Sequence, residues 1–189
     1  MSFWNANGFL IENLDERCII MPKNFDYWGL NVFNSYPLIN INTPECRKLV
    51  NEQMFREIRK GVYESLEFIS KKELLNCYIT ACRKNKLNIR ILFVESQYTK
   101  EIWDGPTPKM KLLGYEYCPI PIDNQIITDL DWYLPLAEYI KKLNQYGLFD
   151  TYEDAIKFKT SYDGHFKKGE VGDGEMETFI FRISEVFAF

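Results

Sequence analysis

The sequence predicts an α+β fold in which a mixed or antiparallel sheet packs with about four helices. Short apolar runs typical of strands lie near both ends and in the middle of the chain, and segments with helical periodicity lie between them. The predicted order is strands, two helices, strands, two helices and a last strand. A doubly wound parallel sheet would instead show a regular alternation of strand and helix, so α+β is the expected class.

A single α+β domain spanning residues 1–189 is expected, because this is an ordinary length for one domain. Hydrophobic residues make up 46% of the chain and aromatic residues 16%, which is enough apolar material for a sizeable core. We expect most Phe side chains in that core. Some Tyr and Trp side chains instead suit a partner-binding surface, where these residues are enriched.

The first third of the chain is expected to begin with strands and continue with a helix. Apolar runs at residues 9–11 and 18–21 flank a polar stretch and predict a hairpin, and the aromatic segment 25–33 predicts a third strand. Thr43 and Pro44 predict the start of the first helix, because Thr is a good N-cap and Pro fits the first helical turn.

Ser70 is expected to open the second helix, since residues 70–73 match the pattern of a capping box. This helix has a broad apolar face with basic residues on either side of it. The face comprises Leu74, Leu75, Tyr78, Ile79 and Cys82, and the flanking residues are Lys71, Lys72, Arg83, Lys84 and Lys86.

Two strands and a helix are expected in the middle of the chain. Residues 89–95 are dense in β-branched and aromatic side chains and predict a central strand, and residues 113–118 predict another strand. A helix is expected from about residue 131 to residue 146, where Gly147 would end it.

The last part of the chain predicts a short helix, a loop and a strand. Thr151 is expected to cap the helix, and a charged, glycine-rich loop is expected over residues 163–175. Residues 176–189 contain alternating apolar side chains, which predict a strand with one buried face.

The net charge of −4 is unevenly distributed along the chain. Residues 43–90 carry eleven basic and six acidic side chains, whereas the rest of the chain is strongly acidic. The acidic majority argues against nucleic acid as the main partner, because neutralising phosphates requires clustered Lys and Arg. It is compatible with a basic protein partner.

The five cysteines are scattered and include no CxxC pair, so neither a zinc knuckle nor a thioredoxin-type motif is predicted. Free thiols are the expected state. Residues 1–17 lack the basic and apolar regions of a signal peptide, and no stretch approaches the ~20 apolar residues of a membrane helix. We therefore expect a cytoplasmic protein with no membrane partner.

The sequence lacks the common catalytic and nucleotide-binding motifs. It contains no GxxxxGK[ST] phosphate loop, no GxGxxG after a strand and no GxSxG nucleophile motif. The single histidine, His165, falls in the expected charged loop, where a solvated side chain is the usual outcome. We expect no catalytic residues, no cofactor and no metal, and a protein that is not an enzyme.

Acidic residues leave an enzymatic alternative open. Asp123, Asp129 and Asp131 lie close together in the sequence, and a second acidic run lies at residues 170–177. Such carboxylates, or one of the thiols, could serve a small hydrolase or transferase. A solvated acidic surface is the more common origin of such runs. A structural or assembly subunit is a further alternative.

Two motifs in the second half of the chain carry a family resemblance. Residues 112–119 read LLGYEYCP, and residues 143–149 read LNQYGLF and lead into TYEDAIKF at 151–158. These segments resemble immunity proteins of bacterial polymorphic toxin and contact-dependent inhibition systems. In that family an L-G-Y-D/E-Y-like strand precedes a polar stretch and a helix, and a later N-x-x-G-L-F segment leads into E-x-A. The chain departs from the pattern at residues 119–122, where Pro and Ile replace Gly- or Ser-rich residues.

The resemblance implies a small cytoplasmic protein that binds and neutralises a cognate toxin domain. The toxin is expected to be basic, and neutralisation is expected to work by steric and electrostatic occlusion. We expect the contact to be formed by acidic residues beside an aromatic strand. The predicted partner-binding residues are Tyr115, Glu116, Tyr117, Asp123, Asp129 and Asp131.

Overall fold

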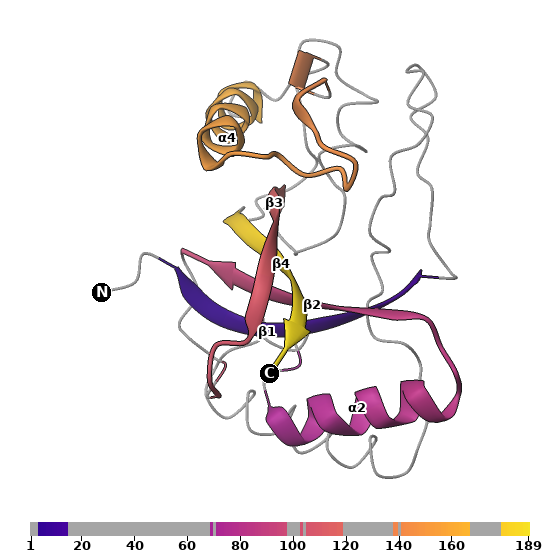
Figure 1. Cartoon of the computed structure of the whole chain (residues 1–189). Coiled ribbons are helices and arrows are strands. Elements are labelled where there is room, and N and C mark those ends of the chain that lie inside the picture. The colour runs from indigo at the N-terminus through magenta and orange to yellow at the C-terminus, as the bar shows by residue number, and fades with distance from the viewer. Residues whose placement is uncertain are drawn as a thin grey trace. The chain divides into compact units, whose positions relative to one another are not determined.

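The computed structural model confirms the α+β class in the part of the chain that it describes. That part comprises residues 4–14, 69, 71–97, 103, 105–118, 138–139, 141–166 and 179–189. Its elements are β1 (Asn5–Asn13), α2 (Lys72–Lys84), β2 (Ile89–Ser96), β3 (Lys109–Cys118), α4 (Tyr152–Phe166) and β4 (Phe179–Ala188) (Figure 1). The helix predicted from Thr43 and the strands predicted at 18–21 and 25–33 lie outside the described residues.

The four strands form one sheet in the order β1-β2-β4-β3. The chain also separates into two compact units, one with residues 1–16, 36–111 and 184–189, and one with residues 17–35 and 112–183. The first unit contains β1, α2 and β2, the second contains α4, and β3 and β4 contribute residues to both. The expected single domain stays a prediction.

β1 and β2 pair in antiparallel fashion, with Phe9 opposite Phe93 and Ile11 opposite Ile91. The predicted strand at residues 89–95 is confirmed as β2, and it lies between β1 and β4 in the sheet. Side chains alternate between the two faces of a strand, so this register places all four apolar residues on one face. That face is the one covered by α2 in the first unit.

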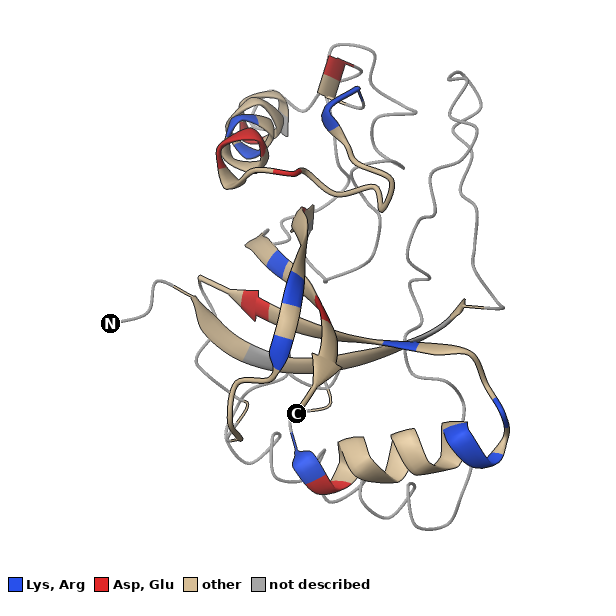
Figure 2. Cartoon of the chain, viewed as in Figure 1, with Lys and Arg blue, Asp and Glu red and all other residues tan. Residues whose placement is uncertain are grey.

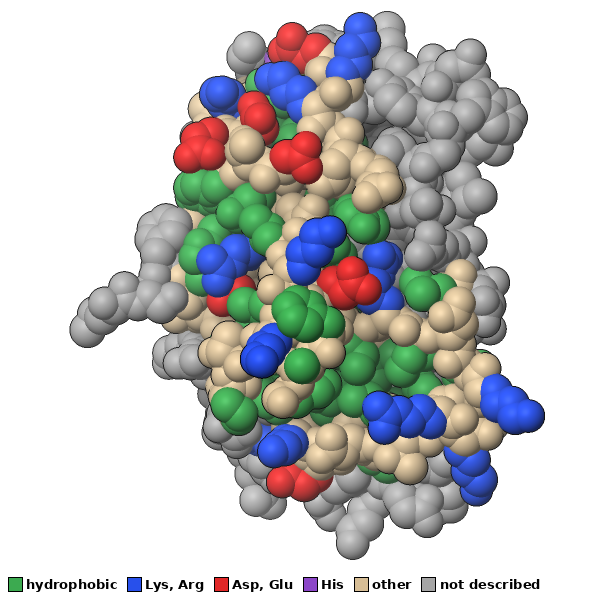
Figure 3. Space-filling model, in the orientation of Figure 1, with side chains coloured by type: hydrophobic (Ala, Val, Ile, Leu, Met, Phe, Trp, Pro, Cys, Tyr) green, Lys and Arg blue, Asp and Glu red, His purple; other side chains and the backbone are tan. Residues whose placement is uncertain are grey.

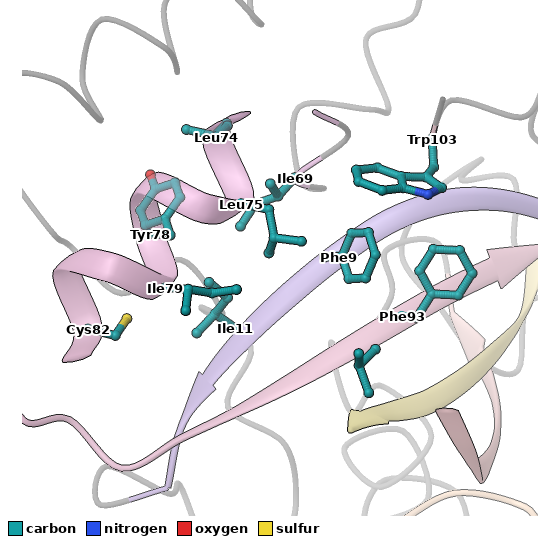
Figure 4. Close-up of a cluster of buried hydrophobic side chains, with 11 residues drawn as sticks. Phe9, Ile11, Ile69, Leu74, Leu75, Tyr78, Ile79, Cys82, Phe93 and Trp103 are labelled. Atoms are coloured by element: carbon teal, nitrogen blue, oxygen red, sulfur yellow. The ribbon is translucent and has the colours of Figure 1, made fainter. Parts of the chain in front are cut away.

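The core of the first unit lies between α2 and the sheet (Figure 4). The Phe9 ring centroid lies 4.9 Å from that of Phe93 and 4.6 Å from that of Trp103. Each fully buried large apolar side chain stabilises the fold by about 1.5–3 kcal/mol, so this cluster holds the helix on the sheet. The predicted apolar face of the helix is confirmed as buried in its five residues Leu74, Leu75, Tyr78, Ile79 and Cys82.

The two ends of α2 differ in how they are capped. The predicted capping box is wrong, because the N-cap residue is Lys71, whose side chain makes no capping hydrogen bond. At the other end, the Leu87 N–H donates to the Cys82 carbonyl and the Lys86 N–H donates to the Arg83 carbonyl. These two bonds form a Schellman motif, with Lys86 in the left-handed conformation at φ 54°.

The last strand differs from its prediction. β4 begins at Phe179 and is buried on both faces, since Ile180 and Ser184 on one side and Phe181 and Ile183 on the other are all inaccessible. Neighbouring strands cover the edges of a strand and not its faces, so this burial requires packing on both sides of β4, which alternation in the sequence does not reveal.

The helix predicted to run to residue 146 is also wrong at its described end. Residues 138–139 and 141–142 form 3₁₀ turns, and Leu143 already pairs with Phe149 in a β-bridge. A residue whose backbone pairs across a bridge cannot continue a helix, so the pairing of Leu143 with Phe149 replaces the last turn of the predicted helix.

The cysteines depart from the expectation of free thiols. Cys77 is disulfide-bonded, whereas Cys82 is a free and buried thiol. Burial raises the pKa of the Cys82 thiol. Burial also raises the pKa of the Tyr78 hydroxyl, and the nearby Cys82 raises it further by a smaller electrostatic effect. Among the described residues, no helix is long and apolar enough to cross a membrane.

These two raised pKa values predict a loss of stability at alkaline pH. The unfolded chain ionises at the ordinary values of about 8.5 for Cys and 10 for Tyr, while the folded chain keeps both protons to higher pH. The stabilising contribution is therefore complete below the ordinary pKa and is lost as pH rises toward the folded value. Urea unfolding at about pH 8 and about pH 10.5 should show the fall. Tyr78→Phe, which keeps the ring, should make the fall smaller, and an unchanged fall in this variant would contradict the assignment.

Candidate functional site

The two motifs that carry the family resemblance lie against each other in the second unit. The Tyr115 N–H donates to the Phe149 carbonyl at 2.8 Å, and the Phe149 N–H donates to the Tyr115 carbonyl at 2.9 Å. This reciprocal pair forms an antiparallel bridge between β3 and the segment 143–149, which we call the docked loop. Motifs distant in the sequence therefore form one structural feature.

Gly114 permits this close approach. A Cβ atom at this position would lie 2.6 Å from the Phe149 carbonyl oxygen and 2.7 Å from the Leu148 Cβ, both closer than real contacts allow. The φ angle of +152° is also one that residues with a side chain rarely adopt. The glycine of the LLGYEY segment is thus required by the docked loop.

The Asn144 side chain organises the docked loop. Its amide nitrogen donates to the Leu113 carbonyl at 2.8 Å and to the Asp150 carboxylate at 2.9 Å. Its amide oxygen accepts from the backbone N–H groups of Tyr146 and Leu148, at 2.9 and 3.3 Å. One side chain therefore joins β3, the loop and the residue that precedes the cap of α4, and all its hydrogen-bonding groups are used.

Gly147 completes the turn within the docked loop. Its N–H donates to the Asn144 carbonyl at 3.0 Å, and its φ angle of 73° lies in the left-handed region that glycine adopts without strain. The sequence predicted this glycine as the end of a helix. The observed turn needs the same left-handed conformation at Gly147, but the residue does not end a helix.

Thr151 caps α4, as predicted. The Asp154 N–H donates to the Thr151 hydroxyl at 3.2 Å, and that hydroxyl donates to the Asp154 carboxylate at 2.9 Å. The helix is longer than expected, because residues 163–166 continue it instead of starting the predicted loop. His165 accordingly lies in the last turn of α4.

Tyr117 fastens β3 to α4. Its ring contacts Phe158 and Tyr162 at centroid distances of 5.6 and 5.5 Å. Its hydroxyl donates to the Asp163 carboxylate at 2.7 Å, and the Lys159 ammonium donates to the other oxygen of that carboxylate at 2.7 Å. The same ammonium lies 5.2 Å from the centroid of the Tyr117 ring. This arrangement serves packing and alignment of the two elements.

The structure separates the predicted partner-binding residues by accessibility. The side chains of Glu116 and Tyr117 are only 1% and 3% exposed, so they present no surface to a partner in this structure. Tyr115 is half-buried. The other predicted residues, Asp123, Asp129 and Asp131, lie outside the described residues.

Tyr115 pairs with a residue that the sequence did not indicate. Its ring centroid lies 5.9 Å from that of Tyr152, in the first turn of α4, and Tyr152 is also half-buried. We call these two residues the tyrosine pair. Asp150 and Glu153, on either side of Thr151 and Tyr152 in the sequence, are exposed. The candidate site is therefore an accessible aromatic pair next to a carboxylate-bearing helix start.

Other ionic contacts near α4 are peripheral to this site. The Lys142 and Lys157 ammonium groups lie 3.9 and 3.6 Å from the Asp154 carboxylate. Such exposed pairs contribute at most about 1 kcal/mol each. Within the described ranges, no group of three or more His, Cys, Asp or Glu side chains is placed to hold a metal ion.

No protein-family model, curated protein or solved structure matches this chain.

Two glycine substitutions should have opposite effects on stability. Gly114→Ala should lower the free energy of unfolding by about 1–3 kcal/mol or more, because it combines a backbone clash with a strained φ. Gly164→Ala in α4, where no atom lies within 4 Å of the added methyl, should raise it by up to about 1 kcal/mol through helix propensity. Urea unfolding measures both changes. Equal effects of the two substitutions would show that the docked loop does not contact β3 as described.

Proposed function

We propose that this chain is an immunity protein that binds and occludes a cognate bacterial toxin domain. The observation that carries the proposal is the contact between the two resembling motifs, through Gly114 and the Tyr115–Phe149 bridge. Both motifs thus contribute to one β3–loop–α4 unit, in which the glycines and the asparagine of the resemblance have structural roles.

The tyrosine pair is the proposed aromatic anchor for the toxin. Tyr side chains bring a large apolar ring and a polar hydroxyl to an interface, and they are enriched among the residues that dominate binding energy. Tyr115 lies on a strand and Tyr152 on a helix, so both are held by regular structure. Little conformational entropy is then lost when a partner packs against them.

Carboxylates near the pair in the sequence fit a basic toxin. Asp150 and Glu153 are exposed, and Asp123, Asp129 and Asp131 are proposed as further partner-binding residues. Opposite charges on the two proteins accelerate their encounter and select the partner, while the anchor supplies most of the affinity. Glu116 and Tyr117 then act indirectly, by holding β3 in place.

Occlusion requires no chemistry from this chain. A bound protein that covers a toxin's substrate groove neutralises it for as long as the complex lasts, so a slow dissociation rate is the property to be optimised. A pair of anchored rings with charged surroundings supplies such an interface. The proposed protein is accordingly a binding partner and not an enzyme.

Co-expression with the product of the gene immediately upstream tests this function. The chain should rescue cells from the toxicity of that product. Replacing both residues of the tyrosine pair with Ala should weaken binding by about 2–4 kcal/mol, or roughly 30-fold or more, in a titration with the purified toxin. Charge reversal of Asp123, Asp129 and Asp131 should weaken it by more than about tenfold.

A matched control lies on the other unit of the chain. Asn76→Ala and Thr80→Ala change two exposed positions of α2, and this double variant should bind as the unchanged chain does. Thermal unfolding should show that the variants are folded. Failure of the chain to protect, or equal affinity of the tyrosine-pair variant, would count against the proposal.

A further inference from the structure

Among the described residues, the surface of the first unit carries an excess of exposed positive charge. Its exposed ionisable side chains include one carboxylate, that of Glu73. Against it stand six exposed cationic side chains, on α2, on the turn after it and on β3, and none of the six forms a salt bridge. The six residues are Lys72, Arg83, Lys84, Lys86, Lys109 and Lys111.

The second unit shows that the chain does pair lysines elsewhere. There Lys142 and Lys157 lie near Asp154, and Lys159 bonds to Asp163. The cations of the first unit therefore differ from an ordinary mixed surface, in which both signs are interspersed. Figure 2 shows them at both ends of α2 and along β3.

Apolar side chains lie between these cations. On the face shown in Figure 3, hydrophobic side chains gather between α2 and the strands, with Lys and Arg around them. Leu87, Ile89, Ile91 and Met110 pack against the core but stay partly accessible. Phe189 is 63% exposed, and its ring centroid lies 5.5 Å from that of Phe9, so it extends the core outward.

We propose that this basic-rimmed apolar surface binds an extended acidic protein segment with carboxylates near its two ends and apolar side chains between them. Lys72 and Lys84 lie at opposite ends of α2, which at 1.5 Å per residue are about 18 Å apart. An extended segment of about six residues spans that distance at 3.3 Å per residue. Carboxylates near its two ends then face the cations at the ends of α2, while the apolar side chains between them contact the apolar surface.

A protein segment fits this surface better than a nucleic acid does. The whole chain has a net charge of −4, and a long polyanion would bring phosphates near its acidic regions as well. A short segment responds only to charges within about 8 Å, the screening length in physiological salt. The proposal is independent of the toxin-binding function, since it uses other residues and a partner of opposite charge.

Fluorescence anisotropy of the full chain with a labelled synthetic peptide tests the proposal. The probe is a peptide of about ten residues with Glu near both ends and Leu between them, long enough to span α2 when extended. It should bind at least tenfold tighter than the same peptide with Gln in place of Glu, and added salt should narrow the difference. Equal binding of the two peptides, or tighter binding of a single-stranded oligonucleotide with as many charges, would overturn the proposal.

Two double variants with the same change of net charge locate the binding. The double variant Lys72→Glu with Lys84→Glu should weaken binding of the Glu peptide at least tenfold. The double variant Lys141→Glu with Lys157→Glu, at exposed positions of the second unit, should leave the affinity nearly unchanged. Phe189→Ala should weaken it several-fold while thermal unfolding shows a folded chain. Equal weakening by both double variants would mean that only overall charge matters, and would contradict a defined surface.

Discussion

The described part of the second unit depends on the close approach of the docked loop to β3. Two backbone hydrogen bonds between Tyr115 and Phe149 hold the loop, and Gly114 leaves room for it. A backbone bond contributes only about 1 kcal/mol, so the approach also needs the four hydrogen bonds of Asn144, which would be costly to leave unmade. Once the loop is docked, Thr151 starts α4 beside the strand, and Tyr152 reaches Tyr115.

Features that depend on local sequence could be predicted, and those that depend on tertiary contacts could not. The apolar face of α2 and the Thr151 cap follow from spacing and residue type within one turn of helix. The Tyr115–Phe149 bridge and the burial of both faces of β4 involve partners distant in the sequence, which periodicity cannot reveal. The same holds for the candidate site. Tyr115 could be predicted from the sequence, whereas Tyr152 was found only through its ring contact with Tyr115 in the structure.

Burial explains why acidity beside an aromatic strand was an incomplete guide to the site. In the sequence Tyr115, Glu116 and Tyr117 look equivalent, yet the second and third are almost fully covered. Tyr117 has its hydroxyl bonded to Asp163 and its ring packed on α4, which makes it a structural residue. The six exposed cations of the first unit show the converse case, because none of these six forms a salt bridge with a described residue, and spacing along the sequence does not reveal this.

Amide hydrogen exchange at Tyr115 and Phe149 tests the docked loop most directly. Both N–H groups are bonded across the same bridge, so they should be protected to a similar degree and should open together. Asn144→Ala should reduce the protection of both while leaving the Phe93 amide, in the first unit, unaffected. Rapid exchange at Phe149 beside a protected Tyr115 in the unchanged chain would show that the loop is not docked, and the account of the site would fail.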